Sequence, residues 1–365
     1  MTESDTERPE VAIINVGGTI SASVDYETGA ATPQSSAEQI YRTVPEVEDM
    51  ADLSGTTVCN IQSENIRPRH WNQIGNTIEA ELNDGAAGAI IPHGTDVMGH
   101  TGAALSFMFQ DLSKPIILVG AQRSRDRPSS DIYLNLASAV AAATSNLAEV
   151  GVVMHRSTSD ESCWLHPGPK VRKCHTSRRD AFQTVNSRPI GEIKGNSVEF
   201  LDPDGKADRT DEDVECNDGF EDDVALVKLS PNMSPDRIHH LVDEGYEGIV
   251  LEGTGLGHSP EQLDEGIERA ITNEIPVVMT SQCLWGRTNM RVYSRGRNLL
   301  DLGVFPVGDM LPETAYIKLM WVLDKTKDPE RVKEMMQEDL AGEINATSQH
   351  DTYLKPQYEG TPFGK

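Results

Sequence analysis

The stretch VAIINVGGTI, at residues 11–20, sets a pattern that recurs along the chain. Its apolar run at 11–16 ends in two glycines and a threonine, which is typical of a buried strand followed by a tight turn. Apolar runs at 89–91, 115–119 and 150–154 end in similar polar turns, and helical patterns reach to about residue 109 and begin again at about residue 134. This alternation predicts an α/β fold with a mostly parallel, doubly wound sheet. In such sheets ligands bind beyond the carboxyl ends of the strands.

A second, smaller α/β unit is expected after residue 223, because strand patterns at 225–229, 248–251 and 276–280 alternate with helical ones. Before it, residues 202–223 hold eleven acidic and two basic side chains, which is typical of a solvated connection; a cation or partner site is the alternative. We therefore expect four parts: a domain at 10–200 that carries the catalytic motifs, an acidic linker or surface loop at 201–223, a smaller domain at 224–345 and a tail at 346–365.

The charge balance restricts the possible partners. Lys plus Arg number 32 and Asp plus Glu 58, which gives a formal net charge of −26. A surface this acidic repels phosphate at long range, so a general nucleic-acid scaffold is excluded and any RNA contact must be local or made by a partner. Only 12 of the basic residues are Lys, and acidic side chains occur in almost every polar segment. Such a surface suits a salt-rich cytoplasm, and we expect a halophilic source.

Cysteine usage and hydropathy indicate a soluble cytoplasmic protein. The five cysteines are widely spaced and odd in number, as expected of a reducing compartment. The polar start has no signal-peptide core, and no apolar run approaches the roughly 20 residues that span a bilayer. The grouping Cys163, His166, Cys174 and His175 matches no standard zinc spacing, so no metal is expected.

Threonines at predicted strand ends are the candidate nucleophiles. The chain has no P-loop and no GxSxG elbow, but Thr19 follows two glycines, and Thr95 and Asp96 follow a later strand. A hydroxyl nucleophile needs a group that takes its proton, and Lys173 in KVRKCH supplies one if the fold brings it to Thr95. Each motif alone also has a structural explanation as a turn, a helix cap or a solvated edge.

These motifs resemble those of the asparaginase/glutaminase family of amidohydrolases. The resemblance rests on GGTI (17–20), HGTD (93–96) and Lys173. Longer segments are similar to the D subunits of archaeal glutamyl-tRNA(Gln) amidotransferases, namely SENIRP (63–68), GAQRSRDRPSSD (120–131), VRKCHTSRRDAF (171–182), SQCLWGRTNMRVYS (281–294) and LPETAYIKLMWVL (311–323). The similarity covers about residues 11–345. It implies a two-domain α/β fold that dimerises, with the active site near the subunit boundary.

The resemblance also implies roles for individual residues. Thr19 matches the acyl-accepting threonine, and Tyr26 matches the loop tyrosine that helps to activate it. Thr95, Asp96 and Lys173 match a second hydrogen-bonded triad, and which of the two threonines attacks stays open. Ser63, Glu64 and Asp96 match residues that bind the amino-acid end of the substrate.

By the same resemblance, the chain is a glutaminase subunit that supplies ammonia to a partner, the E subunit of the amidotransferase. That partner converts Glu-tRNA(Gln) to Gln-tRNA(Gln) with ATP and Mg²⁺ and makes most of the tRNA contact, so no cofactor is expected in this chain. A homodimer at the core of a heterotetramer is implied. The alternative is a free-standing L-asparaginase, and the preference between glutamine and asparagine stays open, as does the route of ammonia.

Two departures from the family pattern bear on these expectations. The D subunits carry a small β domain ahead of the catalytic region, whereas the first predicted strand here begins at residue 11. Either partner docking differs, or the chain is a fragment or has a misplaced start. Val97 stands where the family often has another threonine, which is expected to alter the hydrogen bonding around Thr95.

Overall fold

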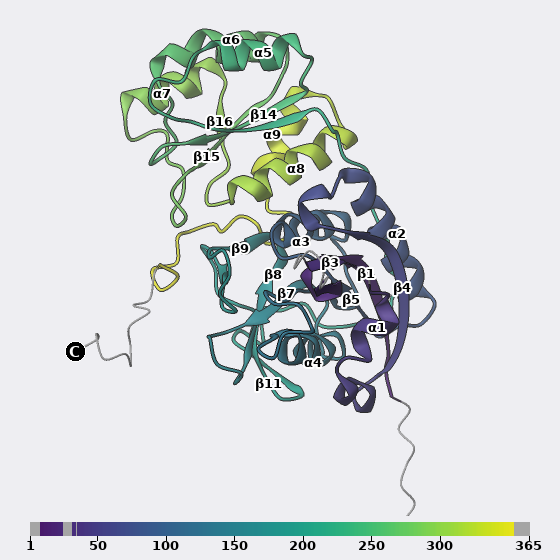
Figure 1. The fold of residues 1–365 in the computed structure, drawn as a ribbon. Helices are drawn as coiled ribbons and strands as arrows, with labels where there is room; N and C mark the ends of the chain where they lie inside the picture. Colours follow the sequence, from purple (N-terminus) through teal and green to yellow (C-terminus); the bar gives the residue numbers. More distant parts are fainter. Residues whose placement is uncertain (1–7, 25–30, 34, 354–365) are drawn as a thin grey trace, which may run out of the picture. The chain divides into compact units, whose positions relative to one another are not determined.

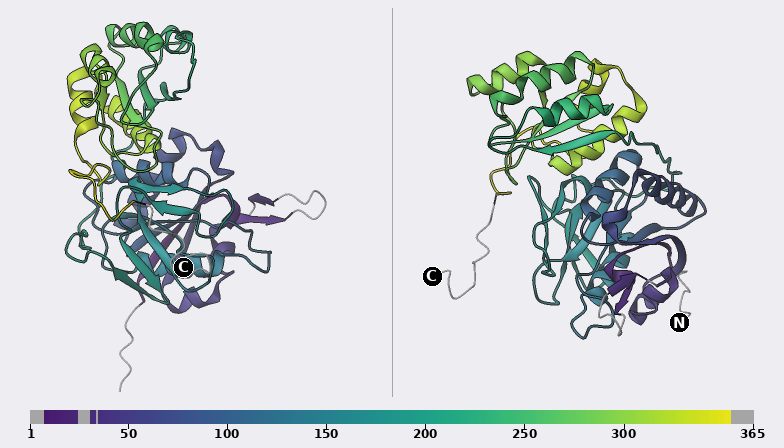
Figure 2. Two further views of the ribbon diagram at one scale, coloured as in Figure 1. Left: turned by 90° about the vertical axis from the view of Figure 1, so that its left-hand side faces the viewer. Right: turned by 45° about the horizontal axis from the view of Figure 1, so that its top comes forward.

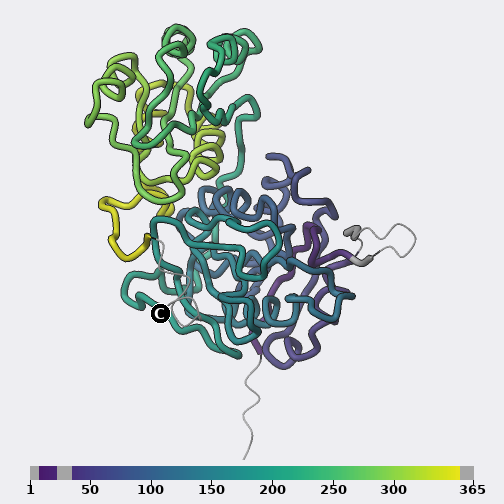
Figure 3. The backbone as a smooth tube through the Cα atoms, turned by 60° about the vertical axis from the view of Figure 1, so that its left-hand side comes forward, coloured from purple at the N-terminus to yellow at the C-terminus, as the bar shows by residue number. Residues whose placement is uncertain are grey.

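The computed structural model describes residues 8–24, 31–33 and 35–353. They form two compact units: unit 1 comprises residues 8–183 with 189–220, and unit 2 comprises 184–188 with 221–353 (Figure 3). Each unit is built on its own sheet flanked by helices, so the predicted fold class, a larger and mostly parallel α/β sheet followed by a smaller one, is confirmed. Among these residues, no helix is both long and apolar enough to cross a bilayer.

Unit 1 contains an eight-stranded sheet in the order β12-β11-β8-β7-β6-β5-β1-β4. Its strands are β1 (Glu10–Gly17), β4 (Asp52–Ile61), β5 (Gly88–Pro92), β6 (Ile116–Val119), β7 (Val150–His155), β8 (Cys163–Pro167), β11 (Gly191–Lys194) and β12 (Ser197–Phe200). The five strands from β4 to β7 are parallel, and the remaining three are antiparallel to their neighbours. All residues of β5, β6 and β7 are buried, as expected of parallel strands covered on both faces.

Helices cover both faces of this sheet (Figure 1). On one face α1 (Ala37–Tyr41) and α4 (Ile132–Ala143) share an apolar core with alternate strand residues such as Val11 and Ile13. On the other face lie α2 (Pro68–Asn83) and α3 (Met98–Met108), which contact each other and the strands. The short elements of the unit are η1 (Thr19–Ser21), β2 (Ala22–Val24), β3 (Ala31–Pro33), η2 (Pro45–Asp49), η3 (Ser63–Asn65), η4 (Gly168–Lys170), β9 (Val171–Lys173) and β10 (Phe182–Thr184).

The strand order creates a crevice at one defined place. The chain runs from β1 to β4 on one side of β1, and then continues through β5, β6 and β7 on its other side. Beyond the carboxyl ends of β1 and β5, the segments that follow the two strands therefore diverge, which is where open α/β sheets bind ligands. The antiparallel pair of β2 and β3 follows β1 (Figure 2).

Unit 2 is built on a four-stranded parallel sheet in the order β13-β14-β15-β16. Its elements are β13 (Val224–Lys228), α5 (Asp236–Asp243), β14 (Gly248–Gly253), η5 (Glu261–Leu263), α6 (Asp264–Thr272), β15 (Val277–Ser281), α7 (Ser294–Leu302), β16 (Phe305–Pro306), α8 (Pro312–Lys325) and α9 (Pro329–Gln337). One apolar core joins α5, α6 and α7 to the sheet, and α8 contacts β13, β14 and β15.

The acidic segment is bound to unit 1 along much of its length. Backbone hydrogen bonds join the Ala148 N–H to the Ala207 carbonyl at 3.0 Å and the Thr210 N–H to the Ser113 carbonyl at 2.9 Å. The side chain of Val214 is only 3% exposed. Residues 201–220 therefore form an irregular but attached surface segment, and only the last few acidic residues before β13 belong to unit 2.

A buried ion pair joins α8 to the segment that follows α9. Lys318 and Glu343 have fully buried side chains and contact each other through Nζ and Oε1. Glu343 also accepts hydrogen bonds from the backbone N–H groups of Leu340 and Ala341. Because two buried charges compensate each other, removal of one leaves the other without its counter-ion.

Replacing Lys318 with methionine is expected to lower the free energy of unfolding by about 3–5 kcal/mol, since Glu343 is then a buried, uncompensated charge. The matched control is Lys327→Met, whose side chain is 51% exposed and whose ion pairs are worth about 1 kcal/mol or less. Urea unfolding measures both. The double variant Lys318→Met/Glu343→Gln should be more stable than Lys318→Met, and equal losses in Lys318→Met and Lys327→Met would contradict this account.

Candidate active site

A small polar pocket lies beyond the carboxyl ends of β1, β4 and β5. It has a volume of about 140 Å³, and its lining comes from three segments: Gly18, Thr19 and Ala22; Gln62, Ser63 and Glu64; and Gly94, Thr95 and Asp96. Five of the predicted site residues, Thr19, Ser63, Glu64, Thr95 and Asp96, thus line one cavity at the crevice that the strand order creates. Gln62 and Ala22 were not predicted.

The pocket depends on backbone segments that approach each other closely. A Cβ atom on Gly18 would lie 2.2 Å from the Cα atom of Gly94, and one on Gly94 would lie 2.6 Å from the Cβ of Ser63. Gly18 also has a φ of +79°, which glycine adopts without strain. Only glycine at both positions allows the turn after β1 to contact the turn after β5.

The turn that carries Thr19 is held by a buried asparagine. Asn15, 0% exposed, accepts hydrogen bonds through Oδ1 from the Gly17 N–H at 3.1 Å and from the Ser21 hydroxyl at 2.7 Å. Its Nδ2 donates to the carbonyl of Ser35 at 3.0 Å. These hydrogen bonds hold residues 17 and 21, on either side of Thr19, so the buried Asn15 fixes the position of the turn that carries Thr19.

Lys173 connects Thr95 with Asp96. Its Nζ lies 2.8 Å from Thr95 Oγ1 and 2.7 Å from Asp96 Oδ1. The Lys173 side chain is 13% exposed, whereas that of Asp96 is 66% exposed. Lys173 ends β9, which is far from Thr95 in sequence, and the fold brings the two side chains together.

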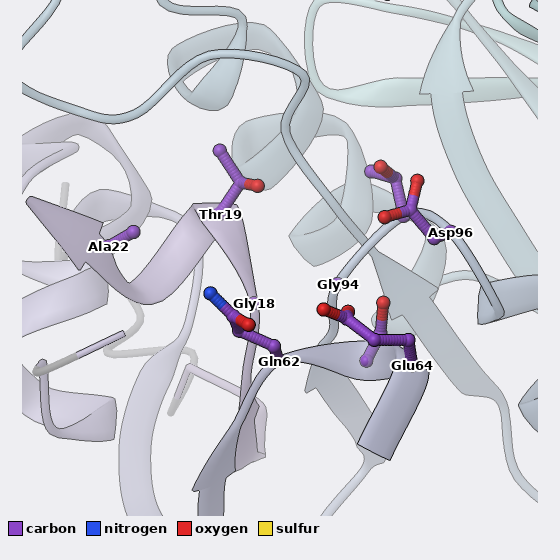
Figure 4. A pocket seen from close by; sticks show the side chains of 9 residues that line it. Gly18, Thr19, Ala22, Gln62, Glu64, Gly94 and Asp96 are labelled. Carbon is purple, nitrogen blue, oxygen red and sulfur yellow. The ribbon is translucent and has the colours of Figure 1, made fainter. Parts of the chain in front are cut away.

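Thr19 lies across the pocket from Asp96, with the Thr19 hydroxyl directed into the cavity (Figure 4). Glu64 is exposed and stands on the same side of the pocket as Asp96, whereas Ser63 is buried in η3. Among the described residues, no side chain forms a hydrogen bond with the Thr19 hydroxyl. The predicted contribution of Tyr26 falls on residues outside the described part of the chain.

Two histidines that follow β5 in the sequence, His93 and His100, are held neutral. Burial lowers the pKa of His93 to about 4, although the hydrogen bond with the Gly94 carbonyl acts in the opposite direction. Burial, and then the charge of Arg172, lower the pKa of His100 to about 4 as well. At neutral pH neither of these two rings is therefore an imidazolium ion.

The grouping of cysteines and histidines around residue 170 is spread over two environments. Cys163 and His166 are buried in β8, whereas Cys174 and His175 are exposed after β9. Among the described residues, no group of three or more His, Cys, Asp or Glu side chains is arranged to hold a metal ion.

Sequence reasoning missed the residues that support the pocket from below, including Asn15, Ser21 and Thr101. A signal for one of them was present, since Asn15 interrupts an otherwise apolar strand and a buried amide needs hydrogen-bond partners. Its partners come from segments separated in sequence, and no local pattern identifies them.

The chain matches two family models over most of its length. Residues 10–205 match the asparaginase N-terminal domain, and residues 223–336 match the glutaminase/asparaginase C-terminal domain. Among solved structures, the thermostable L-asparaginase from Thermococcus kodakarensis is 31% identical, with a TM-score of 0.83 over 93% of this chain and 100% of that one. L-asparaginase I from Vibrio cholerae is 27% identical, with a TM-score of 0.80 over 93% of this chain and 99% of that one.

The curated relatives include D subunits of glutamyl-tRNA(Gln) amidotransferase. The protein from Pyrococcus abyssi is 53% identical over 95% of this chain and 79% of its own length. The one from Methanothermobacter thermautotrophicus is 50% identical over 93% of this chain and 78% of its own length. With both family domains in order and these identities over nearly the whole chain, the protein belongs to the asparaginase family, in the group formed by the D subunits of glutamyl-tRNA(Gln) amidotransferases.

Proposed function

We propose that this chain is a glutaminase subunit, which hydrolyses the side-chain amide of glutamine and supplies ammonia for the conversion of Glu-tRNA(Gln) to Gln-tRNA(Gln). The observation that carries the proposal is the bridge from Lys173 Nζ to Thr95 Oγ1 and Asp96 Oδ1, at 2.8 and 2.7 Å, in a pocket that a second threonine also lines. Two hydroxyls, a lysine and a carboxylate are the groups that nucleophilic amide hydrolysis needs.

Thr19 is the proposed nucleophile. It is less buried than Thr95 and its hydroxyl points into the cavity (Figure 4). Its oxygen forms a bond to the amide carbon while its proton leaves, and backbone N–H groups of the glycine turns stabilise the resulting oxyanion. The carbon–nitrogen bond then breaks, ammonia departs with a proton, and a glutamyl ester of Thr19 remains. Tyr26 is proposed to assist proton removal, by its match to the family tyrosine.

Lys173 is proposed to act through Thr95. As an ammonium group it donates to both Asp96 and Thr95, so the Thr95 oxygen is an acceptor and its own proton is available to the pocket. That hydroxyl is then placed to donate to the departing nitrogen and later to orient the water that hydrolyses the ester. Glutamate and free Thr19 are the products of the second step.

The carboxylates of Asp96 and Glu64 are proposed to bind the α-amino end of the substrate. Asp96 and Glu64 stand on one side of the pocket, opposite Thr19 (Figure 4). This supports the assignment of the substrate α-ammonium to Asp96, with Ser63 and Glu64 as neighbouring contacts. The side chain of the substrate then extends towards Thr19.

A partner subunit is proposed to carry the rest of the reaction. The E subunit of the amidotransferase would bind ATP, Mg²⁺ and most of the tRNA, and this chain would need no cofactor of its own. The net charge of −26 supports this division, because phosphate-rich ligands are repelled by most of the surface. We further propose a homodimer at the core of a heterotetramer, working in the cytoplasm.

The second candidate function is free-standing L-asparagine hydrolysis. It is favoured by one specific observation, namely the match to a solved L-asparaginase over 93% of this chain and all of the other. The same threonines and carboxylates serve either substrate, since glutamine and asparagine differ by one methylene group.

Replacing Thr19 with alanine or Lys173 with methionine is expected to lower ammonia release by about 10³-fold or more, because each removes a group that acts in the chemical steps. The controls are Thr272→Ala, at an exposed position on α6, and Lys194→Met, whose side chain is 57% exposed. Circular dichroism checks that all four variants fold. Wild-type rates in Thr19→Ala or Lys173→Met would refute the site assignment.

Ammonia release from glutamine should be slow with the chain alone and rise about tenfold or more when the E subunit, ATP and Glu-tRNA(Gln) are all present. Each component is omitted in turn as the control, and light scattering of the chain alone reports whether it is a dimer. Fast asparagine hydrolysis that no addition changes would instead establish the free-standing asparaginase.

The acidic surface predicts salt-dependent stability, because 58 carboxylates repel one another until cations screen them. The midpoint temperature of thermal unfolding should be higher in roughly 3 M potassium chloride than in roughly 0.1 M. Equal midpoints at both concentrations would argue against a salt-rich source.

A further inference from the structure

Below the pocket, three buried side chains from three elements form a hydrogen-bonded chain. The indole Nε1–H of Trp71 in α2 donates to Thr101 Oγ1 in α3 at 3.0 Å. Thr101 Oγ1 lies 2.9 Å from Nε2 of His93, and Nδ1 of His93 lies 2.6 Å from the carbonyl oxygen of Gly94. None of the three side chains is more than 4% exposed. None of them lines the pocket, and the catalytic proposal does not use them.

The two ends of this series of hydrogen bonds, Trp71 and the Gly94 carbonyl, fix the direction of every hydrogen bond in it. The Trp71 indole only donates, so Thr101 accepts from it and directs its own hydroxyl proton to His93. The Gly94 carbonyl only accepts, so the proton of His93 must be on Nδ1. The low pKa of His93, about 4 because of burial, keeps the ring neutral and leaves Nε2 free to accept from Thr101.

The series of hydrogen bonds ends at the peptide group between Gly94 and Thr95. The described peptide bonds are all trans, so the N–H of Thr95 points away from the Gly94 carbonyl and thus away from His93. Among the described residues, no oxygen accepts a hydrogen bond from the Thr95 N–H, and Gly94 and Thr95 both line the pocket. The orientation of the Gly94 carbonyl therefore sets where the Thr95 N–H and hydroxyl stand.

We propose that His93 and Thr101, oriented by Trp71, are positioning residues that fix the peptide group between Gly94 and Thr95 and so hold Thr95 in its catalytic orientation. The proposal rests on the proposed function for its kinetic consequence, but its structural content, the Nδ1–H tautomer of His93, does not. Loss of the Thr101 hydroxyl leaves Nε2 of His93 without its donor, while Nδ1–H still faces the Gly94 carbonyl. The imidazole ring is then held on one side only, and the ring can rotate together with the peptide group that it contacts.

The test compares Thr101→Val with Thr101→Ser in the full chain. Thr101→Val removes the hydroxyl with little change of volume and is expected to lower kcat for ammonia release about 10–100-fold, with KM changed less than about threefold. Thr101→Ser keeps the hydroxyl and should retain kcat within about threefold. Unchanged kcat in Thr101→Val, or an equal loss in Thr101→Ser, would overturn the proposal.

A second pair of variants serves if Thr101→Val does not fold. His93→Asn places an amide nitrogen near the position of Nδ1 and keeps a donor for Gly94, whereas His93→Gln places it near Nε2. His93→Asn should retain about tenfold more activity than His93→Gln, and the reverse order would contradict the proposal.

Nitrogen-15 NMR of histidine-labelled protein gives a readout that does not depend on activity. The signal of His93, assigned by its loss in His93→Asn, should show the proton on Nδ1 in the parent chain, and the Nε2 resonance should shift in Thr101→Val because that nitrogen loses its donor. A proton on Nε2 in the parent chain would overturn the proposal even if the enzyme is active. If the unmodified protein releases no ammonia from glutamine or asparagine, the proposed function fails. The tautomer of His93 still tests whether His93 and Thr101 are arranged as proposed.

Discussion

The contact between Gly18 and Gly94 is the constraint on which the site depends. A Cβ atom on Gly18 would lie 2.2 Å from the Cα atom of Gly94, and one on Gly94 would lie 3.2 Å from the Cα atom of Gly18, so the two turns touch through bare backbone. The parallel neighbours β1 and β5 bring these turns together, and the strand order leaves a crevice beside them. Thr19 follows one glycine and Thr95 follows the other, so the spacing of the two hydroxyls is set by the sheet itself. The geometry of the pocket is therefore a consequence of the fold.

Buried hydrogen bonds between uncharged groups hold this arrangement. Asn15 fixes the turn that bears Thr19, and His93 engages the peptide group before Thr95. Neither residue carries a charge at neutral pH. The carboxylates of Asp96 and Glu64, by contrast, line the pocket itself.

The sequence was informative wherever local pattern decides structure. Apolar runs that end in polar turns predicted β1, β5, β6 and β7 closely, and their alternation with helical patterns predicted a mostly parallel sheet. The edge strand β4 was missed because its alternating Ser, Gly and Thr residues lack an apolar run. Five predicted residues line the pocket, and Lys173 contacts two of them, Thr95 and Asp96. The family motifs had singled out all six residues. The sequence could not predict that Asn15, or the hydrogen bonds joining Trp71, Thr101 and His93, support the pocket. These contacts join segments that are distant in sequence.

The central claim is that the amide carbon of the substrate becomes bonded to Thr19, and covalent trapping tests it most directly. The chain would be treated with a glutamine analogue whose side-chain amide is replaced by a reactive diazoketone, digested and mapped by mass spectrometry. The account predicts one adduct per chain, on Thr19, abolished by excess glutamine. An adduct on Thr95, on an exposed thiol such as Cys174 or Cys283, or on no residue at all would contradict it.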